Sequence, residues 1–130
     1  MKNIILILSS FFLFSCSDIY QPAVVSARKE ASQIGLEIMK NGGNAYDAMI
    51  ATHLALAVVH PTAGNIGGGG FFVYHHEDGS SGSLDFREMA PGNAFKDMYL
   101  DENGDVIPDM STLGGAAVGV PGSISAIYEI

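Results

Sequence analysis

Arg87 is the residue of this sequence whose type and setting offer the clearest chemistry. It lies in the segment Asp85–Pro91, which reads DFREMAP. A guanidinium is always charged and presents a planar fork of donors, which suits two-point binding of a carboxylate such as the α-carboxylate of an amino acid. An ion pair with Asp85 or Glu88 is the alternative, because most arginines beside acidic residues are solvated or paired locally. The residues alone leave both roles open.

A glycine run precedes this arginine and must help to position it. The run is Gly67–Gly70, within the segment His60–Phe71 that reads HPTAGNIGGGGF. Consecutive glycines let a chain turn sharply or let another backbone approach closely. A phosphate-binding loop does not fit, because its glycines follow a strand and open a helix, whereas this run follows a predicted helix and precedes a predicted strand. A structural turn and an anion-binding nest remain as alternatives.

A hairpin is predicted to carry Arg87. Its strands are Phe71–His76 and Ser83–Arg87, and an Asp-Gly turn lies between them. Alternation places Phe72 and Tyr74 on one face of the first strand and its remaining apolar residues on the other. Because it is apolar on both faces, this strand is expected to be central, between helices and a second sheet.

Asp85 and Glu88, the acidic neighbours of Arg87, are predicted to differ in role from each other if the second strand continues to the arginine. Asp85 then shares the face of Arg87 and orients its guanidinium. Glu88 then points away from Arg87 and serves as a structural partner.

Two helices are predicted before the bend. The first ends at Lys40, ahead of two glycines, and its apolar residues recur at helical spacing: Ala31, Ile34, Ile38 and Met39. The second, Ala45–Val59, begins at a capping pair formed by Asn44 and Asp47. It is apolar on nearly every side, which predicts a helix buried between other layers.

The later part of the chain is rich in turns. A short helix is predicted over Asn93–Leu100, followed by an acidic turn at Asp101–Asp105. Pro121 suits the first turn of a last helix. The pattern of that helix reaches Ile130, so we expect the chain to be a piece of a longer protein.

The remaining reactive side chains are assigned structural roles. Adjacent histidines on a strand point to opposite faces and cannot bind one metal ion together. The threonines lie in a predicted helix, a bend and a loop, where local hydrogen bonds are expected. These residues are His53, His60, His75, His76, Thr52, Thr62 and Thr112. No metal site is predicted.

Three segments, in this order, closely resemble the amino-terminal part of the γ-glutamyltranspeptidases: Asn41–Ala48 (NGGNAYDA), His60–Phe71 and Leu84–Pro91. The resemblance implies an α+β fold, namely part of the four-layer αββα sandwich of the amino-terminal nucleophile hydrolases, and no cofactor. It implies that Arg87 binds the α-carboxylate of a γ-glutamyl group taken from glutathione or a similar donor.

The same resemblance implies that the catalytic residue lies elsewhere. In this family the nucleophile is the first threonine of a small subunit, and no residue of this sequence matches that motif. We therefore expect the intact enzyme to transfer γ-glutamyl to water or amino acids with a small-subunit segment as partner, and this chain alone to be inactive. A related acylase, a poly-γ-glutamate depolymerase and a non-catalytic lipoprotein remnant are the alternatives.

The amino terminus predicts export. Residues 1–15 have one basic residue, a short apolar run and a small residue before Cys16, as in a secretory signal peptide. The segment around Cys16 resembles a bacterial lipobox, which implies lipidation of this cysteine, with ordinary signal cleavage as the alternative. Residues 16–26 are then a tether, and residues 27–130 form the γ-glutamyltranspeptidase-like part.

Composition limits the partners of the chain. The sequence has 6 basic and 14 acidic residues among 130, a net charge of -8. Nucleic acid and anionic lipid headgroups both require clustered Lys or Arg, so neither is an expected partner. We expect a protein of the cell envelope or periplasm, held at the membrane by its lipid alone.

Overall fold

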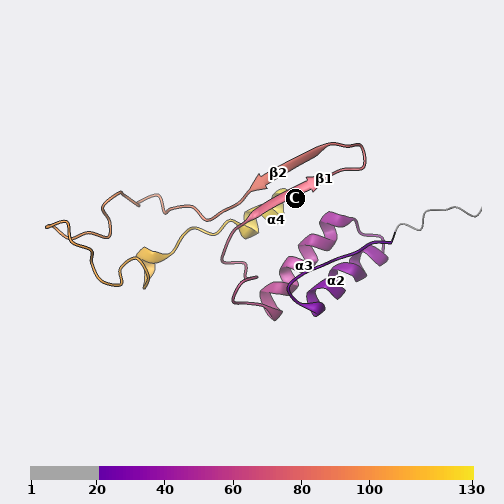
Figure 1. Cartoon of the computed structure of the whole chain (residues 1–130), viewed down its shortest axis with the longest axis horizontal. Coiled ribbons are helices and arrows are strands. Elements are labelled where there is room, and N and C mark those ends of the chain that lie inside the picture. Colours follow the sequence, from indigo (N-terminus) through magenta and orange to yellow (C-terminus); the bar gives the residue numbers. More distant parts are fainter. Residues whose placement is uncertain (1–20) are drawn as a thin grey trace, which may run out of the picture.

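The computed structural model describes residues 21–130 as a small α+β unit (Figure 1). The elements in chain order are α2 (Lys29–Lys40), α3 (Ala45–Val59), β1 (Phe71–His75), β2 (Ser81–Asp85), the 3-10 helix η2 (Gly115–Ala117) and α4 (Ser123–Glu129). Helices α2 and α3 lie side by side, with the β1–β2 hairpin beyond α3. The α+β class is thus confirmed. The predicted signal peptide and Cys16 lie outside the described residues.

Helices α2 and α3 pack closely because Gly35 has no side chain. A Cβ atom at Gly35 would lie 3.0 Å from the carbonyl oxygen of Ala48 and would also meet the hydroxyl of Thr52. Ala31, Ala48 and Thr52 are buried around this contact. The predicted end of α2 at Lys40 is confirmed, and Gly42 follows with a φ of 96°, which favours glycine. Ile34, placed on the apolar face by its spacing, is 42% exposed.

The start of α3 is fixed by the predicted capping box. The Asn44 side chain accepts hydrogen bonds from the amides of Tyr46 and Asp47, at 2.7 and 3.0 Å. The Asp47 carboxylate accepts in return from the Asn44 amide, at 2.9 Å. The predicted bounds Ala45–Val59 are confirmed, and His60 forms the C-cap.

One expectation for α3 was wrong within the described residues. The helix was expected to be buried on nearly every side, yet Leu54 is 43% exposed and Val58 is 79% exposed. The reason is that α2 covers one side of α3, at Ala48 and Thr52, and the hairpin reaches only its first turn through Tyr46. Residues 23–27 and Gly64 lie against part of the remaining surface of α3, but they leave Leu54 and Val58 exposed.

The hairpin forms with the expected faces. Its antiparallel register pairs Phe71 with Asp85, and Gly79 in the turn has a φ of 86°. Phe72 and Tyr74 share the face that contacts Tyr46 of α3, with ring centroids 5.8 and 6.1 Å from the Tyr46 ring.

The opposite face of the hairpin is uncovered. Phe71 is 65% exposed and Val73 is 75% exposed, so β1 belongs to a two-stranded sheet in the described residues rather than to a central position. The adjacent histidines point to opposite faces, as predicted: His75 is bonded to Ser81, and His76 to the Tyr46 hydroxyl.

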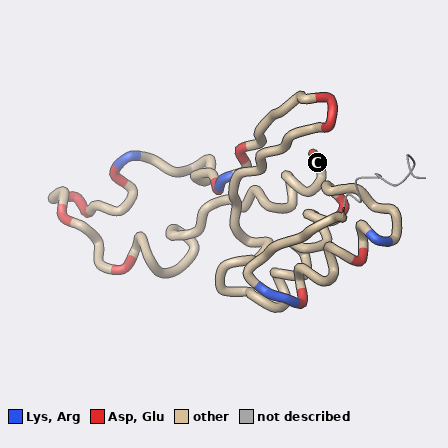
Figure 2. The backbone as a smooth tube through the Cα atoms, turned by 45° about the vertical axis from the view of Figure 1, so that its right-hand side comes forward, with Lys and Arg blue, Asp and Glu red and all other residues tan. Residues whose placement is uncertain are grey.

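Residues 88–120 form an arm that extends away from the helices and the hairpin (Figure 1). The short helix predicted over Asn93–Leu100 was wrong: this segment consists of turns, closed by a bridge between Leu100 and Val106. The acidic turn is confirmed, since the Asp101 carboxylate accepts two backbone hydrogen bonds within it. Figure 2 shows acidic residues along this arm and at the tip of the hairpin, and few basic ones.

Candidate functional site

Arg87 lies just beyond the end of β2, at the base of the hairpin. The strand ends at Asp85, although the pairing continues by one hydrogen bond, from the Phe86 amide to the Gly70 carbonyl at 3.0 Å. The predicted strand over residues 83–87 therefore extends two residues too far and starts two residues too late. The bend after Asp85 is stabilised by the Asp85 carboxylate, which accepts from the Arg87 amide at 3.0 Å.

The glycine run packs directly against the backbone that carries Arg87. A Cβ atom on Gly69 would lie 2.8 Å from the Glu88 nitrogen and 2.9 Å from the Arg87 carbonyl carbon. No residue of the run has a positive φ. Within the run, Gly69 therefore requires glycine because another backbone approaches it closely, which is one of the two uses that the sequence allows.

The same run also joins the site to the last helix. The Gly68 carbonyl accepts from the amides of Gly122 and Ser123, at 3.0 and 3.1 Å, where α4 begins. Pro121 lies ahead of this point, so α4 starts two residues later than the sequence indicated. These bonds connect segments about fifty residues apart, and no local sequence signal marks them.

The guanidinium of Arg87 is held on one side and free on the other. Its Nε lies 3.3 Å from an Oε atom of Glu88, and its central carbon lies 5.9 Å from the centre of the Phe71 ring. The side chain of Arg87 is 63% exposed. Neither Nη nitrogen has a hydrogen-bond partner within residues 21–130. One Nε bond therefore leaves the two-pronged end of the fork available for a ligand.

Two expectations for the acidic neighbours of Arg87 were wrong. Glu88 was expected to point away from Arg87, yet it forms the ion pair. Asp85 was expected to orient the guanidinium, yet it bonds the backbone amide of Arg87. Both differences have one cause: the strand alternation on which they rested stops at Asp85.

The ionised form of Glu88 is favoured at this position. Hydrogen bonding from its own backbone amide holds the pKa of the Glu88 carboxyl below its usual value; burial acts in the opposite direction, and the Arg87 guanidinium and the Gly69 amide lower the pKa by smaller amounts. The charged form of Glu88 is therefore the one that pairs with Arg87.

A cavity of about 230 Å³ adjoins Arg87. Its wall combines the base of the hairpin with the start of α4, and the α4 residues on it are Ser125, Ala126 and Glu129. These residues and Phe71 were not predicted as part of the site, because no local pattern marks them. Gly122, just before α4, also lies close to this site, since a Cβ atom there would meet the Phe86 backbone.

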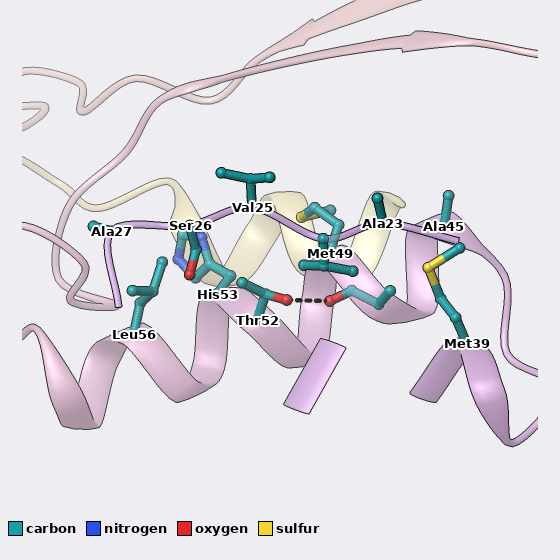
Figure 3. Close-up of a pocket in the computed structure, with 12 residues that line it drawn as sticks. Ala23, Val25, Ser26, Ala27, Met39, Ala45, Met49, Thr52, His53 and Leu56 are labelled. Carbon is teal, nitrogen blue, oxygen red and sulfur yellow. Dashed lines mark hydrogen bonds between the residues drawn. The ribbon is translucent and has the colours of Figure 1, made fainter. Parts of the chain in front are cut away.

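A second, larger cavity lies away from Arg87, between α3 and residues 23–27 (Figure 3). Its volume is about 430 Å³, and its lining is mostly apolar. The Thr52 hydroxyl donates to the Ala48 carbonyl at 2.7 Å, the local role predicted for it. His53 lines this cavity, and its Nε2 is buried with no hydrogen-bond partner in residues 21–130.

The described residues contain no cluster of three or more His, Cys, Asp or Glu side chains placed to bind a metal ion. Within the same residues, every helix is too short or too polar to span a bilayer.

Comparison with known proteins identifies the family. Residues 31–130 match the gamma-glutamyltranspeptidase family. The glutathione hydrolase proenzyme of Pseudomonas sp. strain A14 is 55% identical over 104 residues, which are 80% of this chain and 18% of that protein. The crystal structure of Helicobacter pylori gamma-glutamyltranspeptidase is 46% identical with a TM-score of 0.81, and the match covers 88% of this chain and 33% of that one.

A further solved structure, gamma-glutamyltranspeptidase from Pseudomonas nitroreducens complexed with L-DON, is 45% identical with a TM-score of 0.79, over 88% of this chain and 33% of that one. The chain belongs to the gamma-glutamyltranspeptidase family and corresponds to its amino-terminal region. It spans about 18% of the length of two curated relatives that it matches, the glutathione hydrolase proenzymes of Pseudomonas sp. strain A14 and Escherichia coli K12. The family predicted from the three segments is thus confirmed.

Proposed function

We propose that this chain is the amino-terminal part of an exported glutathione hydrolase, and that Arg87 binds the α-carboxylate of its γ-glutamyl substrates. The observation that carries the proposal is the free end of the Arg87 guanidinium beside a cavity, in a segment that matches this family. Two parallel N–H···O bonds from that end fit one carboxylate. The Nε bond to Glu88 limits rotation of the fork without occupying its Nη groups.

In the complete enzyme the carboxylate contact acts by positioning. The threonine that opens the small subunit attacks the γ-carbonyl of the donor, its own amine takes the hydroxyl proton, and the amine of the leaving group departs with a proton. Water or the amine of an acceptor amino acid then attacks the resulting ester and releases the threonine. Arg87 holds the far end of the γ-glutamyl group, so that the γ-carbonyl stays within reach of the nucleophile.

In the proposed enzyme, the described helices and hairpin are part of a four-layer αββα sandwich. The uncovered residues of the hairpin and of α3, namely Phe71, Val73, Leu54 and Val58, are apolar and 43% to 79% exposed. Apolar surface of this extent is normally covered. In the proposed enzyme, further strands and helices from the rest of the protein cover both sets.

We also propose that the protein is exported and lipidated at Cys16, because residues 1–15 resemble a signal peptide. Growth with a labelled fatty acid tests it: the protein should carry the label, and Cys16→Ala should abolish it. Label that persists in Cys16→Ala would refute lipidation at this residue.

Replacement of Arg87 tests the central assignment. In the full-length enzyme, Arg87→Ala removes two charge-assisted hydrogen bonds worth roughly 1.5–3 kcal/mol each. We expect kcat/KM for γ-glutamyl-p-nitroanilide to fall by about a hundredfold or more. Arg28, an exposed arginine ahead of α2, gives the matched control Arg28→Ala, which should leave kcat/KM unchanged. Near-normal kcat/KM in Arg87→Ala, with normal folding, removes the assignment.

Sequencing of the gene beyond the codon for Ile130 tests the proposal that the chain is part of an enzyme. We expect several hundred further codons in frame, including a threonine at a self-cleavage junction. A stop codon directly after Ile130, with no small-subunit gene nearby, would leave the family relationship intact but contradict the proposed activity.

A further inference from the structure

We propose that Phe71 is a positioning residue for Arg87, and that its ring is the platform that holds the guanidinium toward the substrate carboxylate. The inference rests on the proposed role of Arg87 as the carboxylate ligand. It adds a second residue to that site, one that does not touch the substrate.

The end of the hairpin places the two side chains together. Phe71 pairs with Asp85, the last residue of β2, and one further bond from the Phe86 amide to the Gly70 carbonyl keeps the chain beside β1. Arg87 follows directly after this bond, and its guanidinium lies over the Phe71 ring.

The observed geometry suits a cation–π contact. The central carbon of the guanidinium lies 5.9 Å from the Phe71 ring centre, within the range of about 6 Å over which such contacts act. Guanidinium groups stack on aromatic faces and leave their edges free for hydrogen bonds. With Nε bonded to Glu88 and the central carbon over the Phe71 ring, the Nη groups are the part of Arg87 that remains for a ligand.

Val73 separates the proposal from a packing role, because Phe71 and Val73 lie on the same face of β1 and the rest of the proposed enzyme would cover both. Phe71 is 65% exposed, and Val73 on the same face of β1 is 75% exposed. The two residues thus stand in similar surroundings, and only Phe71 lies beside the guanidinium. Val73 is accordingly the matched control.

The test uses the full-length enzyme and two substrates. L-γ-glutamyl-p-nitroanilide carries the α-carboxylate, whereas 4-aminobutyryl-p-nitroanilide lacks it. Phe71→Leu keeps apolar volume but removes the ring, so we expect KM for the first substrate to rise roughly twofold to fivefold, with kcat and the KM of the second substrate unchanged. Phe71→Trp should restore KM, because the indole face also binds cations. Val73→Ala should change neither value.

Arg87→Ala is measured in parallel, so that a failure of the carboxylate assignment can be distinguished from a failure of the Phe71 platform. If Arg87→Ala affects both substrates equally, the carboxylate assignment itself fails. If Arg87→Ala discriminates between the substrates but Phe71→Leu behaves like Val73→Ala, only the platform is refuted. A loss of kcat on both substrates in Phe71→Leu, without rescue by Phe71→Trp, shows a structural role instead and also overturns the platform.

Discussion

Gly69→Ala should damage the site more than any other alanine substitution within the glycine run. The new Cβ would meet the Phe86 carbonyl oxygen, lie 2.8 Å from the Glu88 nitrogen and lie 2.9 Å from the Arg87 carbonyl carbon. All three are backbone atoms, so no side chain can move aside. The strand end that carries Arg87 must shift away from the run instead.

The expected cost follows from two opposing effects. Overpacking against atoms that cannot yield costs typically about 1–3 kcal/mol. A glycine-to-alanine change also restricts the unfolded chain, which stabilises by about 0.4–1 kcal/mol where the backbone angles allow alanine. Gly69 has no positive φ, so this gain applies. We expect a net loss of about 1–2 kcal/mol.

The effect on catalysis should be larger than the effect on stability. Displacement of Arg87 by a fraction of an ångström to one ångström moves the carboxylate ligand, and misplacements of that size cost up to about a hundredfold in rate. The assay is kcat/KM for γ-glutamyl-p-nitroanilide in the full-length enzyme, together with the midpoint of thermal unfolding.

Gly67→Ala is the control within the same run. Its Cβ would meet only the Asn65 side-chain oxygen, at 3.2 Å, a contact that a small side-chain movement relieves. We expect normal kcat/KM and an unfolding midpoint that is unchanged or slightly raised. Equal behaviour of Gly67→Ala and Gly69→Ala would refute the argument that close backbone approach selects glycine at Gly69.

Two further predictions concern the helices, and thermal unfolding of the full-length protein measures both. Asn44→Ala removes the side-chain half of the capping box and should destabilise α3 by about 1–2 kcal/mol; an unchanged midpoint would contradict the capping role. Gly35→Ala should destabilise by about 1–3 kcal/mol, because its Cβ would meet the Thr52 hydroxyl and the Ala48 carbonyl. Thr52→Ala removes the hydroxyl and should recover part of that loss in the double variant; additive losses would contradict the proposed contact.

The helices could be read from the sequence because their signals are local. The bounds of α3 follow from the capping pair Asn44 and Asp47 and from the Pro61 that follows His60. The two faces of β1 follow from strict alternation over five residues. Each of these signals acts between residues at most a few positions apart, so the chain needs no distant partner to obey them.

The structure of the segment after Pro91 was predicted less well, because its local signals are weak. The short helix predicted over Asn93–Leu100 has only weak local signals. The segment consists of turns instead, and a bridge between Leu100 and Val106 follows them. A bridge between Met89 and Val120 similarly closes the arm at its base. The pairing of Met89 with Val120 depends on which distant segment lies beside residue 89, and sequence patterns do not encode that directly.

The sequence by itself determined the family, the two helices, the faces of the hairpin and the choice of Arg87 as the residue to test. Only the tertiary structure decided what surrounds Arg87. Because β2 ends at Asp85, Glu88 turns back to pair with the guanidinium. Because the glycine run packs against residues 86–88 and against the start of α4, the site joins three segments distant in the chain. The alternation of side chains along a strand does not predict either contact, because both form beyond the end of the strand.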